Sequence, residues 1–346
     1  MAESDLLHHI RALPKIELHR HLEGAVRLET LIEVAQVYGF EMPEYEVETL
    51  RPFVQMMPDE VHNYQHFLGK FTTLRQFFRS PDIIRRVTQE AVADAAADNI
   101  RYLELRFTPP ALSSIIRCSY QEVIDWVCAA AAEAARAHAI TVRLIVSINR
   151  HESVQNGEEV LQAALAYRDR GVVALDLAGN ENQYPAQPFY PLFKQAKAAG
   201  LFVTIHAGEW AGAEGVREAL TCLHADRIGH GVRSIEDPEL VAELVEHGVS
   251  LEICPSSNLD SGVVAAWPEH PLAPLYRQGV KVTINTDDPI ISAITLSDEL
   301  TRVITRLSFE LDDIKQAILN AAGAAFLPPA ERESLLARFK NWLTVS

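Results

Sequence analysis

Short apolar runs alternate with longer amphipathic segments along almost the whole chain. Several of the short runs are rich in Val, Ile and Leu with little polar alternation, which is typical of strands buried on both faces of a parallel sheet. We expect eight such strands, at residues 16–21, 102–107, 142–148, 172–177, 202–206, 227–229, 250–253 and 281–285.

The segments between these strands have the spacing of apolar positions that amphipathic helices show. We expect helices at residues 82–98, 120–138, 158–170, 189–199, 212–223 and 237–247, and terminal helices outside the sheet at 300–306, 311–323 and 330–343. Eight strands with intervening helices predict an α/β fold, a (β/α)₈ TIM barrel. A doubly wound open sheet is the second architecture, but its single crevice fits poorly with chemistry spread over strands one, five, six and eight. At 346 residues we expect one domain over 1–346.

Extra helices are expected between the first and second strands and at the C-terminus. The connection at residues 40–70 exceeds a minimal connector, and an aromatic patch of Tyr64, Phe67 and Phe71 lies at its end. Such an insertion at the top of a barrel could cover a ligand, or it could form ordinary peripheral helices.

The overall charge narrows the possible partners. A formal net charge of −16 argues against general affinity for nucleic acid or anionic membranes, but not against a small neutral substrate. The four cysteines (Cys118, Cys128, Cys222 and Cys254) show no close pairing, so neither a disulfide framework nor a cysteine zinc site is expected. No signal peptide and no apolar run long enough to span a membrane is visible, and we expect a cytoplasmic protein.

Ionisable residues gather where the expected strands end. His19 and His21 are two positions apart, so on a strand they point to one side and could chelate one ion, although such pairs are also common on surfaces. His206 closes another run, and Glu209 follows it three residues later. A poorly hydrated Glu209 would have a raised pKa and could deliver a proton, or it could only mark the start of a helix.

Two further clusters follow the sixth and eighth runs. His230 stands between two glycines and could be a ligand, a general base or a buried structural histidine. Asp287 and Asp288 precede a proline, so one could bind metal while its neighbour orients water, or both could belong to a turn. Taken together, three histidines and one aspartate suit Zn²⁺ with a position open to water, which predicts a hydrolytic site.

These residues lie in motifs that resemble those of the adenosine/adenine deaminase family. The motifs appear in that family's order as PKIELHRHLEGA, LDLAGNE, HAGE, RIGHG, EICPSSN, NTDDP and NAAGAAFLP. The resemblance implies hydrolysis of a 6-aminopurine at C6 with release of ammonia.

The resemblance also implies a role for each site residue. His19, His21, His206 and Asp287 would ligate one Zn²⁺ per chain. Glu209 would protonate N1 of the purine, Asp288 would orient the attacking water, and His230 would be its base or electrostatic partner. Gly179 would bind N3 through its backbone, and Glu23, His21 and Asp288 would contact the substrate. From the aromatic patch, and not from the resemblance, we also expect Phe67 and Phe71 to contact it. The wider class often bridges two metals with a lysine after strand four, but Asp176–Gly179 contains none, which favours a single metal ion.

Two positions in these motifs bear on which purine is the substrate. Adenosine deaminases usually carry aspartate where this chain has Glu23, and glutamate resembles the adenine and aminodeoxyfutalosine deaminase branches. Thr286 is closer to the adenosine branch, so adenosine or 2′-deoxyadenosine is the expected substrate. The other branches are alternatives. A catalytically silent binding barrel, and a lactone or phosphotriester hydrolase, are competing hypotheses from other classes. The oligomeric state is left open.

Overall fold

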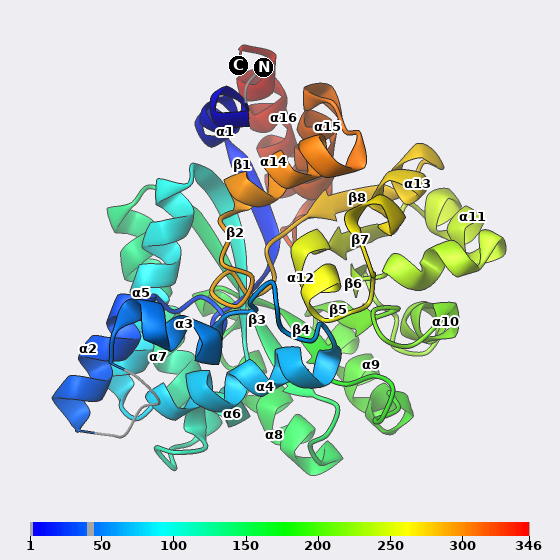
Figure 1. Ribbon diagram of the computed structural model, residues 1–346. Helices are drawn as coiled ribbons and strands as arrows, with labels where there is room; N and C mark the ends of the chain where they lie inside the picture. The colour runs from blue at the N-terminus through cyan, green and yellow to red at the C-terminus, as the bar shows by residue number, and fades with distance from the viewer. Residues whose placement is uncertain (1–2, 40–44, 346) are drawn as a thin grey trace.

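Eight parallel strands form one sheet in the order β1 to β8 at the centre of the molecule, with helices around it (Figure 1). The computed structural model describes residues 3–39 and 45–345. The strands are β1 (Lys15–His21), β2 (Ile100–Phe107), β3 (Thr141–Asn149), β4 (Val172–Ala178), β5 (Phe202–Ala207), β6 (Arg227–His230), β7 (Ser250–Ile253) and β8 (Lys281–Ile284). This arrangement confirms the expected barrel and excludes the open doubly wound sheet. The expected strand limits agree to within about two residues, the usual uncertainty of element ends.

The barrel closes between β1 and the segment that follows β8. Leu18 N–H donates to the Asn285 side chain (2.9 Å), and Thr286 N–H donates to the Glu17 carboxylate (3.0 Å). Beyond them, His21 N–H donates to the carbonyl of Asp287, and Asp287 N–H donates to that of His19. The closing seam therefore sets the two histidines of β1 against Asp287.

Helices separate the strands and cover the outside of the barrel. After β2 come α6 (Pro109–Ser113), α7 (Tyr120–Ala137), α8 (Val154–Leu165), η2 (Arg168–Arg170), η3 (Gln187–Phe189), α9 (Tyr190–Ala198), α10 (Ala213–Thr221), η4 (Val232–Glu236), α11 (Pro238–His247), α12 (Pro255–Asp260), η5 (Trp267–Glu269) and α13 (Leu272–Arg277). Three further helices follow β8: α14 (Leu296–Leu307), α15 (Leu311–Ala324) and α16 (Pro329–Val345). None of the described helices has the length and apolarity needed to cross a membrane.

Two expected helices, at residues 158–170 and 300–306, begin earlier in the structure than expected. The second is α14, which begins at Leu296 because the Thr295 side chain accepts the N–H of Asp298. The Ser153 side chain accepts the N–H of Asn156, so α8 begins at Val154, four residues earlier than expected. It ends at Leu165, where i to i−3 hydrogen bonds tighten the chain, and residues 168–170 form a separate 3₁₀ turn.

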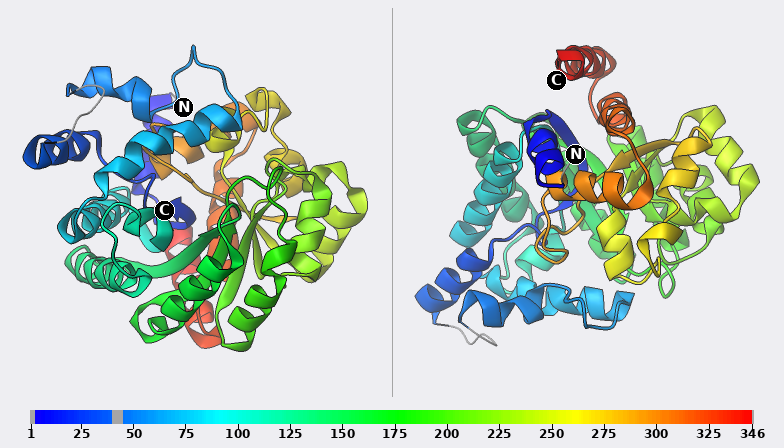
Figure 2. Two further views of the ribbon diagram at one scale, coloured as in Figure 1. Left: turned by 90° about the horizontal axis from the view of Figure 1, so that it is seen from below. Right: turned by 45° about the horizontal axis from the view of Figure 1, so that its top comes forward.

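The expected extra helices before β2 are present. After α1 (Glu3–Ala12) at the N-terminus, the chain forms α2 (Leu28–Tyr38), α3 (Val47–Val54), α4 (Tyr64–Leu74), η1 (Arg75–Phe77) and α5 (Pro81–Ala97). Residues 40–44 of the expected insertion lie outside the described residues. In Figures 1 and 2, α4 lies at one end of the barrel and α16 at the opposite end. Phe67, Leu68 and Phe71 of α4 line a cavity at the first of these ends.

Charged side chains fill much of the barrel interior, where apolar layers are usual. Arg227 donates from Nε to Glu252 and from Nη2 to Glu104, and Arg106 donates to Glu252 at 2.6 Å. All four side chains are at most 1% exposed. A buried charge is costly unless it is paired, and here each of the four groups has a partner of opposite charge. Glu252 also contacts His19 at the strand ends.

Candidate functional site

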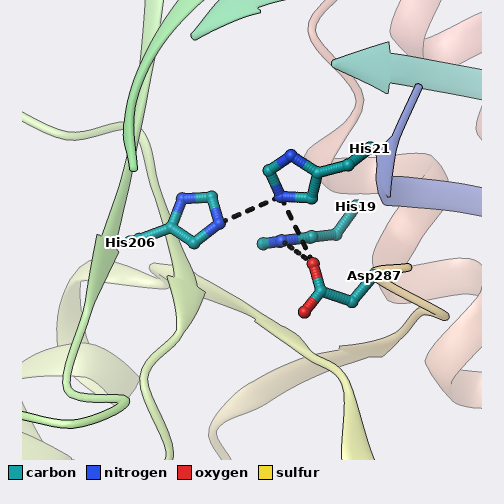
Figure 3. Close-up of side chains that lie close together, drawn as sticks. All are labelled: His19, His21, His206 and Asp287. Atoms are coloured by element: carbon teal, nitrogen blue, oxygen red, sulfur yellow. Dashed lines mark hydrogen bonds and ion pairs between the residues drawn. The ribbon is translucent and has the colours of Figure 1, made fainter. Parts of the chain in front are cut away.

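Four potential metal ligands converge at the carboxyl ends of the strands (Figure 3). His19 and His21 come from β1, His206 from β5 and Asp287 from the segment after β8. One donor atom of each lies within 4.8 Å of one donor atom of every other member. His19 Nε2 is 3.1 Å and His21 Nε2 is 3.3 Å from the same Asp287 oxygen, and His21 Nε2 is 3.2 Å from His206 Nε2. The structure thus brings together the four residues expected to hold a metal.

The surroundings of His19 show what this cluster can bind. Its Nδ1 lies 2.9 Å from Glu252. Burial opposes ionisation of Glu252, but Arg106 and Arg227 outweigh it and hold the pKa of that carboxyl well below its usual value. The ionised carboxylate only accepts, so His19 donates from Nδ1 and, as a neutral ring, carries a lone pair on Nε2. This buried Nε2 has no hydrogen-bond partner although an Asp287 oxygen is nearby. A cation between the two atoms would satisfy both.

His206 is oriented in the same way. Its Nδ1 donates to Asp176 at 2.9 Å, and Asp176 also accepts from Ser147. Burial lowers the pKa of His206 to about 4, so the ring is neutral at physiological pH and its Nε2 carries a lone pair. Carboxylates behind metal-bound imidazoles fix the tautomer in this way. The donor set therefore fits a divalent metal such as zinc.

Glu209 lies against this cluster. Its side chain is buried, and desolvation, followed by the charge of Asp287, raises its pKa well above the usual value. The neutral, protonated form of this carboxyl is therefore favoured, which is the direction of shift that the strand-end pattern predicted. Its loop is fixed from the β4 side, because the backbone N–H groups of Gly208, Glu209 and Trp210 all donate to the Glu181 carboxylate.

His230 and Asp288 complete the group of ionisable side chains. His230 Nε2 lies 3.6 Å from Glu209 and 3.9 Å from Asp287. Desolvation, with a contribution from Asp287, raises the pKa of Asp288, and its Oδ1 is buried without a partner. The backbone at His230 (φ 58°) and at Asp287 (φ 62°) is in the left-handed region. Non-glycine residues seldom adopt it, and such strain clusters at functional sites.

A cavity of about 310 Å³ opens above these groups and is large enough for a small ligand. All the residues expected to contact substrate line it, namely His21, Glu23, Phe67, Phe71, Gly179 and Asp288. Tyr64, the third aromatic residue of the expected patch, instead packs against Trp210, with 5.6 Å between ring centroids. One wall is thus aromatic and the floor carries the ionisable groups.

Several residues of the site were not singled out from the sequence. Glu252 and Asp176 support the histidines, Ser257 donates to Asp287 at 2.7 Å, and Asn258 contacts His230 at 3.2 Å. For Glu252 and Asp176, the sequence did contain an indication, because each is a carboxylate between two apolar residues of an expected strand, at Leu251–Ile253 and Leu175–Leu177. A buried carboxylate needs a charged or hydrogen-bonding partner, so such a position indicates a second layer around a site.

A parallel barrel whose strand ends hold three histidines, an aspartate and a buried glutamate with a raised pKa defines a barrel hydrolase of the metal-dependent kind. The family model described as Adenosine deaminase matches residues 14–342. The chain belongs to the adenosine deaminase family. An adenosine deaminase of Klebsiella pneumoniae subsp. pneumoniae is 36% identical over 330 residues, covering 94% of this chain and 98% of that protein.

Two solved structures share the fold over almost their full length. The adenine deaminase of Arthrobacter aurescens has a TM-score of 0.88 and 28% sequence identity, covering 96% of this chain and 100% of that one. A cog1816 amidohydrolase of Burkholderia ambifaria, with bound Zn, has a TM-score of 0.88 and 27% identity, covering 100% and 95%. These likenesses support the family and leave the choice of purine to the details of the cavity.

Proposed function

We propose that this protein hydrolyses adenosine and 2′-deoxyadenosine to inosine and 2′-deoxyinosine with release of ammonia, using one zinc ion per chain. One observation carries the proposal: a buried Glu209, whose pKa is raised, and a cluster of imidazole lone pairs lie beside the same cavity. An acid next to a metal-type site is what addition of water to a ring carbon requires.

His19, His21, His206 and Asp287 would hold the zinc ion. When bound, the ion would act as a Lewis acid and lower the pKa of water toward about 7. A single ion is supported by the absence of a lysine in Asp176–Gly179. A second cluster, His230, Cys254 and Asp287, shares Asp287 with the first. Burial raises the pKa of the Cys254 thiol well above its usual value, so this cluster is a poor second metal site.

The remaining residues act on the purine and the attacking water. Glu209 gives its proton to N1, which makes C6 electrophilic, and water adds at C6 under the control of Asp288 and His230. The C6–N bond breaks as the C6=O bond forms. One proton of the water goes to the amino group, which leaves as ammonia, the other returns to Glu209, and a 6-oxopurine protonated at N1 remains. The backbone of Gly179 binds N3, while Phe67 and Phe71 cover the base. Gly179 has φ +97°, a conformation that favours glycine.

Glu23 supports a nucleoside over a free base. Its Oε1 accepts the N–H of Thr108 at 2.8 Å, while its Oε2 is buried without a hydrogen-bond partner. An unsatisfied buried acceptor costs about 1–3 kcal/mol, which a hydroxyl donor from the substrate would recover. Adenine has no hydroxyl group, whereas the ribose of adenosine does. Adenine and modified adenine nucleosides are the alternatives.

A panel of purines tests the proposal. The zinc-loaded protein is assayed by absorbance with adenosine, 2′-deoxyadenosine, adenine, AMP and aminodeoxyfutalosine. We expect the highest kcat/KM with the first two. Glu23→Ala should lower kcat/KM for adenosine by about 10²-fold and leave adenine unaffected, because only the nucleoside reaches the free oxygen. The exposed Glu29→Gln is the control. A higher kcat/KM for adenine than for adenosine would contradict the proposal.

A further inference from the structure

Three buried polar side chains, His230, Asn258 and His270, form a hydrogen-bonded series that starts at the cavity and leads away from it. Asn258, in α12, lies next to His230, and His270, just before α13, lies next to Asn258. His230, Asn258 and His270 are 1%, 0% and 1% exposed. Neither Asn258 nor His270 has a part in the proposed chemistry, so their burial needs another explanation.

At the far end of this series, a backbone N–H group donates to His270. Because a backbone N–H can only donate, it fixes the direction of every hydrogen bond in the series. Leu272 N–H donates to His270 Nδ1 at 3.0 Å. That nitrogen must therefore carry a lone pair, and the proton of the neutral ring is on Nε2. Burial lowers the pKa of His270 to about 3, so the ring is neutral at physiological pH. His270 Nε2–H then donates to Asn258 Oδ1 at 3.3 Å.

This bond determines which way the amide of Asn258 points. With Oδ1 facing His270, the Nδ2 group faces His230 Nδ1 at 3.2 Å and donates to it. A flipped amide would set its N–H against the Nε2–H of His270, donor against donor. His230 Nδ1 is therefore an acceptor, and the proton of neutral His230 is on Nε2.

We propose that Asn258 and His270 are positioning residues that hold His230 as an Nε2–H hydrogen-bond donor toward the reacting oxygen, not as its base. This inference rests on the deamination proposed above. His230 Nε2 is beyond hydrogen-bonding distance of both Glu209 (3.6 Å) and Asp287 (3.9 Å), so its N–H is free for the substrate side. A base at this position would need a lone pair on the atom that already carries the proton.

Replacing Asn258 by aspartate distinguishes His230 as a hydrogen-bond donor from His230 as a base. A carboxylate next to Nδ1 only accepts, so it would draw the proton to Nδ1 and leave a lone pair on Nε2. If His230 is a donor, Asn258→Asp should lower kcat for adenosine by about 10²-fold or more, with KM changed by less than about threefold. If His230 is a base, the same variant would keep or raise kcat, and that outcome overturns the proposal. Asn156→Asp, which adds the same charge on α8, should leave kcat unchanged.

A spectroscopic measurement tests the tautomer without relying on turnover. In zinc-loaded protein labelled with ¹⁵N-histidine, with the His230 signals identified from a His230→Gln sample, we expect the proton on Nε2 in the wild type and on Nδ1 in Asn258→Asp. A wild-type proton on Nδ1 overturns the proposal. If no purine is deaminated but the proton is on Nε2, the assigned tautomer stands and the proposed function fails.

Substitutions of His270 test whether a side chain that can donate to Asn258 restores kcat. His270→Phe removes the donor to Asn258 Oδ1, so the amide is no longer held in one orientation and kcat should fall. His270→Gln can still donate through its amide and should recover part of the loss. Zinc content and the melting temperature of each variant show whether the protein is folded. Equal kcat for folded His270→Phe and wild type contradicts the positioning role.

Discussion

Gly24 lies so close to Asp288 that a Cβ atom at position 24 would stand 1.8 Å from Asp288 Oδ1 and 2.6 Å from its Cβ. Asp288 is 3% exposed, and the absence of a side chain at Gly24 leaves the space in which its carboxylate lies. Gly24 lies in a turn but does not have a positive φ, so contact with a residue distant in sequence explains the glycine.

Gly24→Ala should displace the Asp288 carboxylate and impair the reaction. A shift of about 1 Å in a catalytic group can cost about 10²-fold in rate, and we expect a loss of this size in kcat. Overpacking should lower the free energy of unfolding by about 1–3 kcal/mol. Gly323→Ala, in α15 with nothing within 4 Å, is the control and should keep full activity. Wild-type kcat in Gly24→Ala would contradict the assigned role of Asp288.

Glu209→Gln should abolish proton delivery, with kcat reduced by about 10²–10⁴-fold. Because the pKa of Glu209 is raised in the folded protein, wild-type turnover should fall as pH rises through that pKa. Above the unfolded pKa the folded state binds more protons than the unfolded chain, so Glu209 makes stability fall with rising pH. In metal-free protein the glutamine variant should therefore be more stable near pH 8.

Measurements of kcat and of melting temperature across pH check this prediction. Glu158→Gln, on the exposed side of α8, should match the wild type in both. Full turnover in Glu209→Gln would show that the proton comes from another group.

Glu181→Ala should lower kcat without loss of zinc, because three backbone N–H groups that fix the Glu209 loop lose their shared acceptor. We expect a decrease of about tenfold to 10²-fold, and a smaller one for Glu181→Gln, which keeps one oxygen. Steady-state kinetics and metal analysis separate this effect from loss of the metal site. The exposed Glu246→Gln should behave as the wild type, and loss of zinc in Glu181→Ala would point to a wider collapse.

Metal analysis should find about one zinc ion per chain in the purified protein, and His206→Ala should retain less than about a tenth of an ion. Removal of the metal with a chelator should abolish turnover, and added Zn²⁺ should restore it. His247→Ala, at the end of α11, is the control for loss of an exposed histidine. Two tightly bound ions per chain would contradict the single-metal inference.

Much of the fold followed from local patterns. The strands were predictable because each buried run is continuous in sequence, and their ends already carried His19, His21, His206 and Asp287. The starts of α8 and α14 were missed because Ser153 and Thr295 were not recognised as N-terminal caps. For Glu209, the sequence predicted the direction of the pKa shift. The charges that contribute to the shift come from Asp287, Glu181 and Asp288, and all three belong to the ends of other strands.

The sequence by itself determined which residues stand at the strand ends and to which family they belong, since both are encoded by neighbouring positions. The tertiary structure alone decided how the site is supported. It places the Asp287 backbone against β1, Glu252 next to His19, and one oxygen of Glu23 in a buried position without a partner. It also connects Leu272 to His230 through hydrogen bonds with His270 and Asn258. Hydrogen-bond direction and burial depend on atoms that meet only after the barrel closes, where residues as far apart as Leu18 and Asn285 come into contact.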